Sequence, residues 1–102
     1  MPALRFSRRA EGDLRDIAIY TVRAWSVDQA SRYLDELEAC CRTLASNPKL
    51  GRVCDVVRPG LRRMECGRHA IFYRTERGGI LVVRVLHQRM LPELQAMEEG
   101  DG

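Results

Sequence analysis

The sequence predicts a two-layer α+β fold in which an N-terminal strand and a helical hairpin pack on a small antiparallel sheet. Apolar residues recur at helical spacing through the first half of the chain. Runs rich in β-branched residues, separated by glycine turns, fill the second half. A chain of 102 residues builds one hydrophobic core, so residues 1–102 are expected to form a single domain.

The helical hairpin is expected to follow a short strand at residues 4–6. Ser7 is a typical N-cap residue, and an apolar face with helical spacing follows it. Ser26 precedes a second such face, with Gln29 at capping-box spacing. Asn47 precedes a proline that ends this helix, so the two helices meet at one turn. The two faces comprise Ala10, Leu14, Ile17, Thr21 and Trp25, and then Ala30, Tyr33, Leu34, Leu37, Cys41 and Leu44.

The sheet is expected to follow a loop over residues 48–60, where prolines and glycines interrupt any regular element. Turn signals at Gly67 and Gly78 separate the predicted strands. The last strand is a nearly continuous apolar run, which favours an interior position. A short C-terminal helix is expected at residues 92–97, and residues 98–102 are expected to fray. The three strands are predicted at residues 61–66, 69–75 and 80–87.

The charge is unevenly distributed along the chain, although the net charge is only +3. Residues 52–89 carry nine arginines against three acidic residues, whereas residues 90–102 carry four acidic residues and no base. Arginine makes bidentate contacts with carboxylates and phosphates, so the middle of the chain favours an acidic partner or a nucleic-acid backbone. No apolar run is long enough for a membrane helix or a signal peptide, so we expect a cytoplasmic protein.

The four cysteines lack the C-x-x-C spacing of a zinc site, and only two histidines accompany them. We therefore expect four reduced thiols that serve as small hydrophobic residues. The sequence indicates no metal and no cofactor.

A set of short strings occurs in order along residues 3–92. The strings are Asp13-Leu14, Ile17, Tyr20-Thr21, Trp25, Gln29-Ala30, Tyr33-Leu34, Asn47-Pro48, Gly51-Arg52, Arg58-Pro59-Gly60, Arg62, His69, Ile71-Phe72-Tyr73 and residues 84–90. Together they resemble the ParE toxins, in the RelE/ParE superfamily of bacterial toxin–antitoxin systems. The resemblance implies a growth-inhibiting toxin that a ParD-like antitoxin neutralises. It also implies a choice of target, because ParE members are associated with poisoning DNA gyrase and RelE members with cleaving mRNA on the ribosome.

The residues favour the gyrase branch over the ribonuclease branch. Attack by an RNA 2′-hydroxyl needs a general base, a general acid and a cationic clamp on the phosphate. Arginines on neighbouring predicted strands can clamp, but they stay protonated near neutral pH, and only His87 remains near the C-terminal end as an acid–base candidate. We therefore expect inhibition by binding, with no catalytic residue. The four clamp candidates are Arg62, Arg63, Arg74 and Arg84.

Two alternatives stay open. A RelE-like ribosome-dependent mRNA endoribonuclease would use Arg62, Arg84 and His87. An inactive antitoxin-binding module is the second alternative. His87 is either an acid–base group or a structural residue that ties the last strand to the tail. Arg84 lies between apolar neighbours and must pair with a carboxylate, either of the fold or of a partner.

The candidate binding residues fall into two groups. Antitoxins of this family lay an acidic segment along the toxin, and exposed apolar and arginine side chains are expected to receive it. Trp25 is either such an anchor or a core residue that closes the hairpin. The antitoxin-binding candidates are Ile19, Val22, Trp25, Arg62 and Arg74. The candidates for binding gyrase are Arg63, Arg84, His87 and Arg89, and no sequence-specific nucleic-acid binding is expected.

Overall fold

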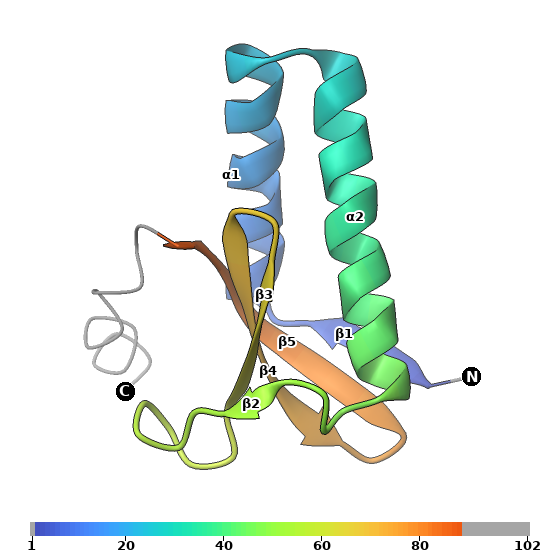
Figure 1. Cartoon of the computed structure of the whole chain (residues 1–102), viewed down its shortest axis with the longest axis vertical. Coiled ribbons are helices and arrows are strands. Elements are labelled where there is room, and N and C mark those ends of the chain that lie inside the picture. Colours follow the sequence, from blue (N-terminus) through green and yellow to red (C-terminus); the bar gives the residue numbers. More distant parts are fainter. Residues whose placement is uncertain (1, 89–102) are drawn as a thin grey trace.

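The computed structural model describes residues 2–88, in which two helices lie against one face of a five-stranded sheet (Figure 1). The helices are α1 (Arg8–Ala24) and α2 (Val27–Ser46). The strands are β1 (Ala3–Phe6), β2 (Arg52–Val53), β3 (Arg62–Cys66), β4 (His69–Glu76) and β5 (Gly79–His87). The predicted α+β fold is confirmed. The helix expected at 92–97 and the fraying expected at 98–102 lie outside the described residues.

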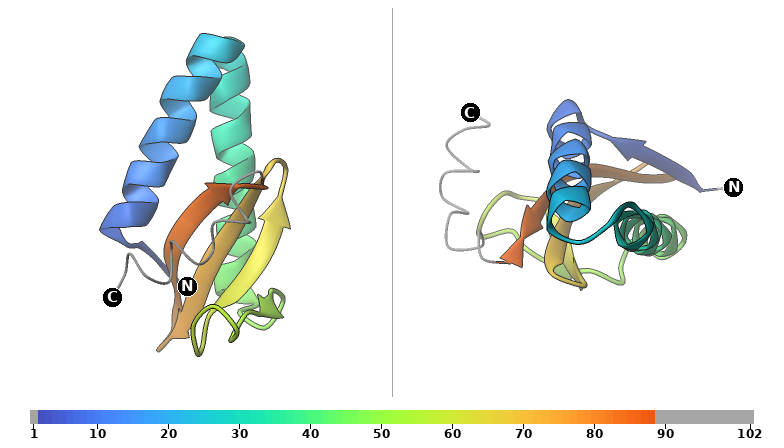
Figure 2. Two further views of the ribbon diagram at one scale, coloured as in Figure 1. Left: turned by 90° about the vertical axis from the view of Figure 1, so that its left-hand side faces the viewer. Right: turned by 90° about the horizontal axis from the view of Figure 1, so that it is seen from above.

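Both helices begin at the residues that the sequence marks as caps. The Ala10 amide donates a hydrogen bond to Ser7 Oγ at 3.0 Å, and the Gln29 amide donates one to Ser26 Oγ at 3.1 Å. These side chains satisfy amides that no carbonyl of the helix reaches. Because Ser26 caps α2 directly after Trp25 caps the end of α1, the hairpin turn is short, and the two helices meet there and diverge toward the sheet (Figure 2).

The sheet is mixed rather than wholly antiparallel. Its strand order is β1-β5-β4-β3-β2, and β1 pairs in parallel with β5, with Ala3 opposite Gly79. A parallel pair needs a long connection, and the rest of the domain supplies it. A Cβ at Gly79 would lie 1.8 Å from the carbonyl oxygen of Ala3, so this pairing requires glycine there. The interior position predicted for the last strand is confirmed.

The loop expected over residues 48–60 contains the two-residue strand β2, which extends the sheet beside β3. A strand this short leaves too little hydrophobic pattern to be recognised in the sequence. Beyond it, residues 54–61 fold over the face of the sheet that the helices leave open. Cys54, Val57 and Leu61 pack there against Phe72 and Leu86. Both faces of the sheet are therefore covered, although the sequence predicted cover from the helical hairpin alone.

A β-bulge interrupts the pairing of β4 with β5. Phe72 lies opposite Arg84, whereas the next residue of β4 lies opposite Val82, so Val83 is an extra residue in β5. In a regular strand, every second side chain faces the same side of the sheet, so Arg84 would lie on the same side as Val82. The extra residue in the bulge reverses this order, and Val85 packs with Val82 in the core beneath the helices. The bulge was not predicted from the nearly continuous apolar run.

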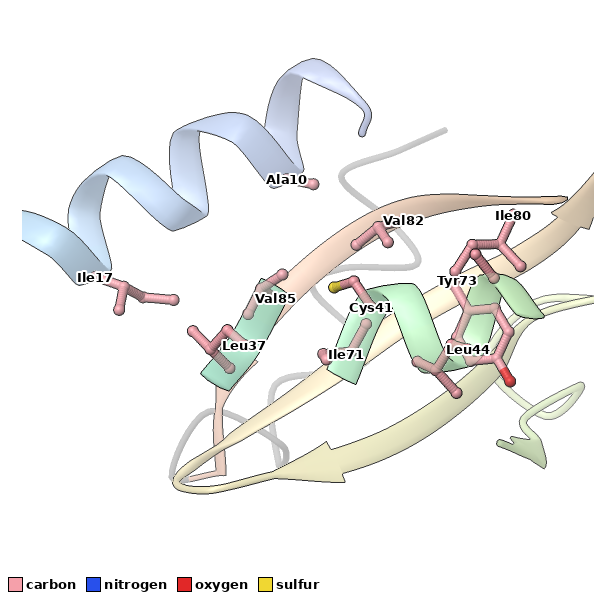
Figure 3. Packing of buried hydrophobic residues seen from close by; sticks show 11 residues of the cluster. Ala10, Ile17, Leu37, Cys41, Leu44, Ile71, Tyr73, Ile80, Val82 and Val85 are labelled. Carbon is pink, nitrogen blue, oxygen red and sulfur yellow. The ribbon is translucent and has the colours of Figure 1, made fainter. Parts of the chain in front are cut away.

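The main core lies between the helical hairpin and the sheet (Figure 3). It joins both helical faces to the inward residues of β4 and β5, so the predicted faces are confirmed at most positions. The fully buried side chains include Leu37, Leu44, Ile71, Tyr73, Ile80 and Val82. Leu4, Phe6, Leu14, Tyr33 and Leu34 are partly buried around this core.

The helical hairpin is longer than the sheet beneath it, and its turn stands well beyond the turn between β3 and β4 (Figure 1). The far part of α1 therefore has little sheet to pack on, and Thr21 is its last buried residue. Trp25 and Val27, which follow Thr21 at the hairpin turn, consequently stay exposed. Within residues 2–88, neither helix is long and apolar enough to cross a membrane.

Candidate functional site

A cleft of about 870 Å³ opens between the far part of the hairpin and the ends of β4 and β5. Tyr20 of α1 and Trp25 at the hairpin turn form one wall, and His69 and His87 at the ends of β4 and β5 form the other. The Arg68 guanidinium carbon lies 5.1 Å from the centre of the Trp25 ring, within the range of a cation–π contact. This contact links the β3–β4 turn to the hairpin turn across the mouth of the cleft.

Side chains at and near the start of α1 form hydrogen bonds with the backbone of the half of β5 that β1 does not pair with. β1 pairs with β5 only as far as Phe6, so beyond that point the edge of β5 needs other partners. Ser7 Oγ donates a hydrogen bond to the Val83 carbonyl at 2.9 Å, and the Val85 amide donates one to Asp13 Oδ2 at 2.9 Å. The side chains of α1 therefore satisfy this edge and set the position of the helix over the sheet.

Asp13 also pairs with Arg84 through two charge-assisted hydrogen bonds. The Nε and Nη2 atoms of Arg84 donate to the two carboxylate oxygens at 2.8 and 2.9 Å. The two side chains are only 18% and 13% exposed, so neither charge is well solvated. The sequence left open whether Arg84 pairs with a carboxylate of this chain or of a partner protein. In the structure it pairs with Asp13 of this chain.

An uncharged hydrogen-bonded cluster forms the strand side of the cleft. The Tyr33 hydroxyl accepts a hydrogen bond from the Arg68 amide at 3.0 Å and also contacts Nδ1 of His69. Because the hydroxyl oxygen already accepts one bond, we assign its proton to the contact with Nδ1 and the ring proton of His69 to Nε2. His87, opposite His69 in the register, packs edge-on against it with ring centres 5.2 Å apart.

The environment of His69 keeps its ring neutral. Burial lowers the pKa of His69 to about 4, and electrostatic repulsion from His87 adds to the effect, while Asp13 opposes it. Burial also raises the pKa of the Tyr33 hydroxyl. Tyr33 and His69 therefore offer hydrogen-bonding groups without charge at neutral pH, and Arg68 brings the positive charge to this cleft.

The predicted clamp arginines do not gather at one place. Arg62 points to the loop after α2 and donates a hydrogen bond to the Gly51 carbonyl at 2.7 Å. Arg63 lies one position along β3, and its Nε is 2.9 Å from a carboxylate oxygen of Glu65 in an ion pair. Neighbouring residues of a strand face opposite sides of the sheet, so these two arginines diverge. Arg74 is exposed on β4, and Arg89 lies outside the described residues.

The proposed ribonuclease residues are also far apart. Arg62 pairs with Tyr73, whereas His87 pairs with His69, which in turn pairs with Cys66. Arg62 and Cys66 are four positions apart on β3, which corresponds to about 13 Å along the strand. Within residues 2–88, no group of three or more His, Cys, Asp or Glu side chains is placed to hold a metal ion.

Among the described residues, five of the eight exposed large apolar side chains lie at residues 19–27, and the other three, Leu50, Val53 and Val56, lie after α2. Ile19, Val22 and Trp25 are 46%, 42% and 45% exposed. Tyr20 and Val27 are more exposed still, at 70% and 68%. These five residues, here called the hairpin patch, lie within nine consecutive positions, and clustering of this kind is typical of interaction surfaces. Trp25 is thus exposed in part and also lines the cleft.

Comparison with known proteins identifies the family. Residues 4–92 match the family described as the ParE toxin of the type II toxin–antitoxin system parDE. The chain belongs to the ParE toxin family. It is 49% identical to Toxin ParE1 of Mycobacterium tuberculosis over 85 residues, which cover 82% of this chain and 87% of the relative. It is 42% identical to Toxin ParE1 of Caulobacter vibrioides over 92 residues, covering 88% and 93%.

A solved structure shows the ParE fold independently of close sequence similarity. A chain from the chromosomal ParDE TA system of P. aeruginosa superposes with a TM-score of 0.72 at 22% identity. The match covers 85% of this chain and 96% of the other. This likeness confirms the predicted fold class. The match to the family and the two relatives confirm the predicted resemblance.

Sequence reasoning missed several residues that shape the site of this ParE toxin. Asp13 appeared only as part of a family string, and its role at the edge of β5 depends on a bulge that the sequence did not reveal. Arg68 falls between two predicted strands, and Tyr33 was predicted on the apolar face of the second helix. Tyr20 lies off the buried face of α1, and Val27 lies at the overhanging hairpin turn.

Replacing Asp13 by Asn should destabilise the domain strongly, because it leaves the poorly solvated Arg84 guanidinium without a countercharge. We expect the free energy of unfolding to fall by about 3 kcal/mol. Glu38→Gln is the matched control, because it breaks an ion pair with Arg42 whose side chains are 52% and 62% exposed. That change should cost about 0.5 kcal/mol or less. Chemical denaturation measures both, and equal losses would contradict the role given to Asp13.

Acidification should reveal the neutral state of His69. Between the ordinary pKa of 6.5 and the folded value of about 4, the unfolded chain binds a proton that the folded chain excludes. The free energy of unfolding should therefore decrease as the pH falls through this range, and His69 should add nothing further below it. Urea denaturation at several pH values, on the wild type and on His69→Gln, measures this contribution. Parallel curves for the two proteins would refute it.

Proposed function

We propose that the hairpin patch is the surface through which this toxin binds its ParD-like antitoxin. The observation that carries the proposal is the concentration of exposed apolar and aromatic side chains at residues 19–27. Binding would bury these residues, and large aromatic residues next to arginine are frequent hot spots of interfaces. The α1 helix presents them on a rigid element, because Asp13 and Ser7 hold that helix on β5.

The proposed occupant is an acidic amphipathic segment of the antitoxin. Arg23 lies in the last turn of α1 and Arg68 stacks on Trp25, so positive charges flank the apolar side chains. An amphipathic helix that lays its apolar side on such a surface is a common mode of recognition. Arg74 is exposed on β4 and supplies a further contact if the segment continues over the sheet, whereas Arg62 already binds the Gly51 carbonyl.

Replacing Val22 by Glu should weaken antitoxin binding, because it puts a negative charge among the apolar contacts. Losing a hot-spot residue weakens the free energy of binding by about 2 kcal/mol, which corresponds to roughly a 30-fold rise in the Kd for the antitoxin. The matched control is Val56→Glu, which makes the same change at a side chain that is 91% exposed in the loop between β2 and β3. Calorimetry with the antitoxin encoded beside this chain measures both affinities.

The two variants also separate neutralisation from toxicity in cells. Val22→Glu should remain toxic when the antitoxin is co-expressed, whereas the antitoxin should rescue cells that express Val56→Glu. Equal affinities of the two variants for the antitoxin would contradict the proposed surface.

We further propose that the toxin inhibits DNA gyrase by binding and not by catalysis. This proposal is supported by the family and by the separation of the groups that cleavage of RNA would require. Arg84 is paired with Asp13, and Arg62 lies four register positions from His87. The proposed contacts with gyrase are Arg63, His87 and Arg89, with Arg84 holding the end of β5 in place.

A direct comparison of targets tests this proposal. Purified toxin should inhibit supercoiling by gyrase or increase gyrase-dependent DNA cleavage, and it should leave ribosome-bound mRNA intact. In the mRNA-cleaving alternative, His87→Gln removes the acid–base group and should reduce cleavage roughly 100-fold or more. In the gyrase proposal, the same variant retains hydrogen bonding and most of the inhibition. An unaffected gyrase together with cut mRNA would establish the alternative.

A third outcome would identify an inactive binding module. In that case neither gyrase nor mRNA is affected, expression without antitoxin leaves growth normal, and the antitoxin still binds. Tight binding with no growth defect would reject inhibition of gyrase, and the affinities of Val22→Glu and Val56→Glu would still test the hairpin patch.

A further inference from the structure

Two of the four thiols lie close together between a helix and a strand. Cys40 of α2 and Cys66 at the end of β3 line the same hollow, and Glu36, which the Cys66 thiol contacts, lies one helical turn before Cys40. The contact of the Cys66 thiol is with the carbonyl of Glu36, at 3.8 Å. Both cysteines are partly buried beside the main core, with Met64 next to them. No local pattern indicates this proximity, because 26 positions separate the two residues.

The pair is accessible from solvent. A hollow of about 390 Å³ opens over α2 and β3, and Cys40 and Cys66 line it together with Thr43 and Leu50. The other two cysteines differ in this respect. Cys41 is only 2% exposed in the main core, and Cys54 is 8% exposed on the opposite face of the sheet. A small reagent can therefore reach one pair of neighbouring thiols and no other.

We propose that Cys40 and Cys66 form a modification site for small-molecule disulfides, in which the two thiols become an intramolecular disulfide that ties α2 to β3. One thiol first attacks the reagent, here oxidised glutathione, which forms a mixed disulfide and releases one glutathione thiol. The second thiol then attacks the protein sulfur of that mixed disulfide and releases the second glutathione thiol. The protein loses two protons and two electrons, and the reagent gains them.

The environment of the pair affects the rate of this exchange. Burial raises the pKa of the Cys66 thiol to about 12, and the neighbouring Cys40 adds to the effect. The thiolate is the attacking form, so exchange is slow at neutral pH and accelerates as the pH rises. The pair therefore stays reduced in a reducing cytosol and oxidises under sustained disulfide stress.

The new bond would constrain a functionally distinct part of the chain. Residues 40–66 include the end of α2, the strand β2 and the loop that covers the second face of the sheet. Closing this segment into a ring restricts the unfolded chain and so stabilises the folded one. The hairpin patch lies outside the ring, so oxidation is expected to change stability without covering that surface.

Oxidation of the purified full chain with oxidised glutathione at mildly alkaline pH tests the proposal. Thiol titration should fall from four free thiols to two, and peptide mapping without reductant should show the Cys40–Cys66 bond. The melting temperature should rise by roughly 5 °C or more and return when reductant is added. Cys54→Ser is the matched control and should form the same bond, whereas Cys66→Ser should form none.

Several results would overturn the proposal. Four free thiols after prolonged treatment would show that the two sulfurs cannot bond in the folded chain. Mapping of the bond to Cys41 or Cys54 would show that the proximity of Cys40 and Cys66 does not direct the reaction. A lower melting temperature after oxidation would show that the disulfide strains the fold instead of stabilising it.

Discussion

The contact of Asp13 with β5 is the constraint on which the proposed binding surface depends. One carboxylate accepts a hydrogen bond from the Val85 amide at the open edge of the strand and pairs with Nε and Nη2 of Arg84. The edge is open because β1 ends at Phe6, and the bulge at Val83 sets which side chains of β5 face α1. The helix is thereby fixed in place, and with it the wall of the cleft and the exposed residues near the hairpin turn.

The exposed apolar side chains of the hairpin lie either off the buried face of α1 or at the hairpin turn. Ile19 and Val22 lie off the face that buries Ile17 and Thr21. Trp25 follows the end of α1, which stands beyond the β3–β4 turn (Figure 1). The stacking of Arg68 on Trp25 supports this overhanging end from the β3–β4 turn. The surface is thus rigid, apolar and bordered by arginine, which suits an acidic partner segment better than it suits a reaction centre.

Much of the fold could be predicted from the sequence because it rests on local signals. Ser7 and Ser26 mark the starts of the helices, Asn47 marks an end, and Gly67 and Gly78 mark turns. The parallel pairing of β1, the bulge and the partner of Arg84 depend on contacts between distant segments, which no local pattern encodes. The candidate site was predicted in part for the same reason, since Ile19, Val22 and Trp25 follow from helical periodicity, whereas the cluster of Tyr33 with His69 does not.

Fluorescence of Trp25, the one tryptophan of the chain, tests the proposed binding surface most directly. Its side chain is partly exposed in the centre of the hairpin patch, so emission should report whether a partner covers it. On titration with a tryptophan-free form of the antitoxin, the emission should shift to shorter wavelength and become harder to quench with acrylamide. Complete binding with unchanged emission and unchanged quenching would place the antitoxin elsewhere and contradict the account.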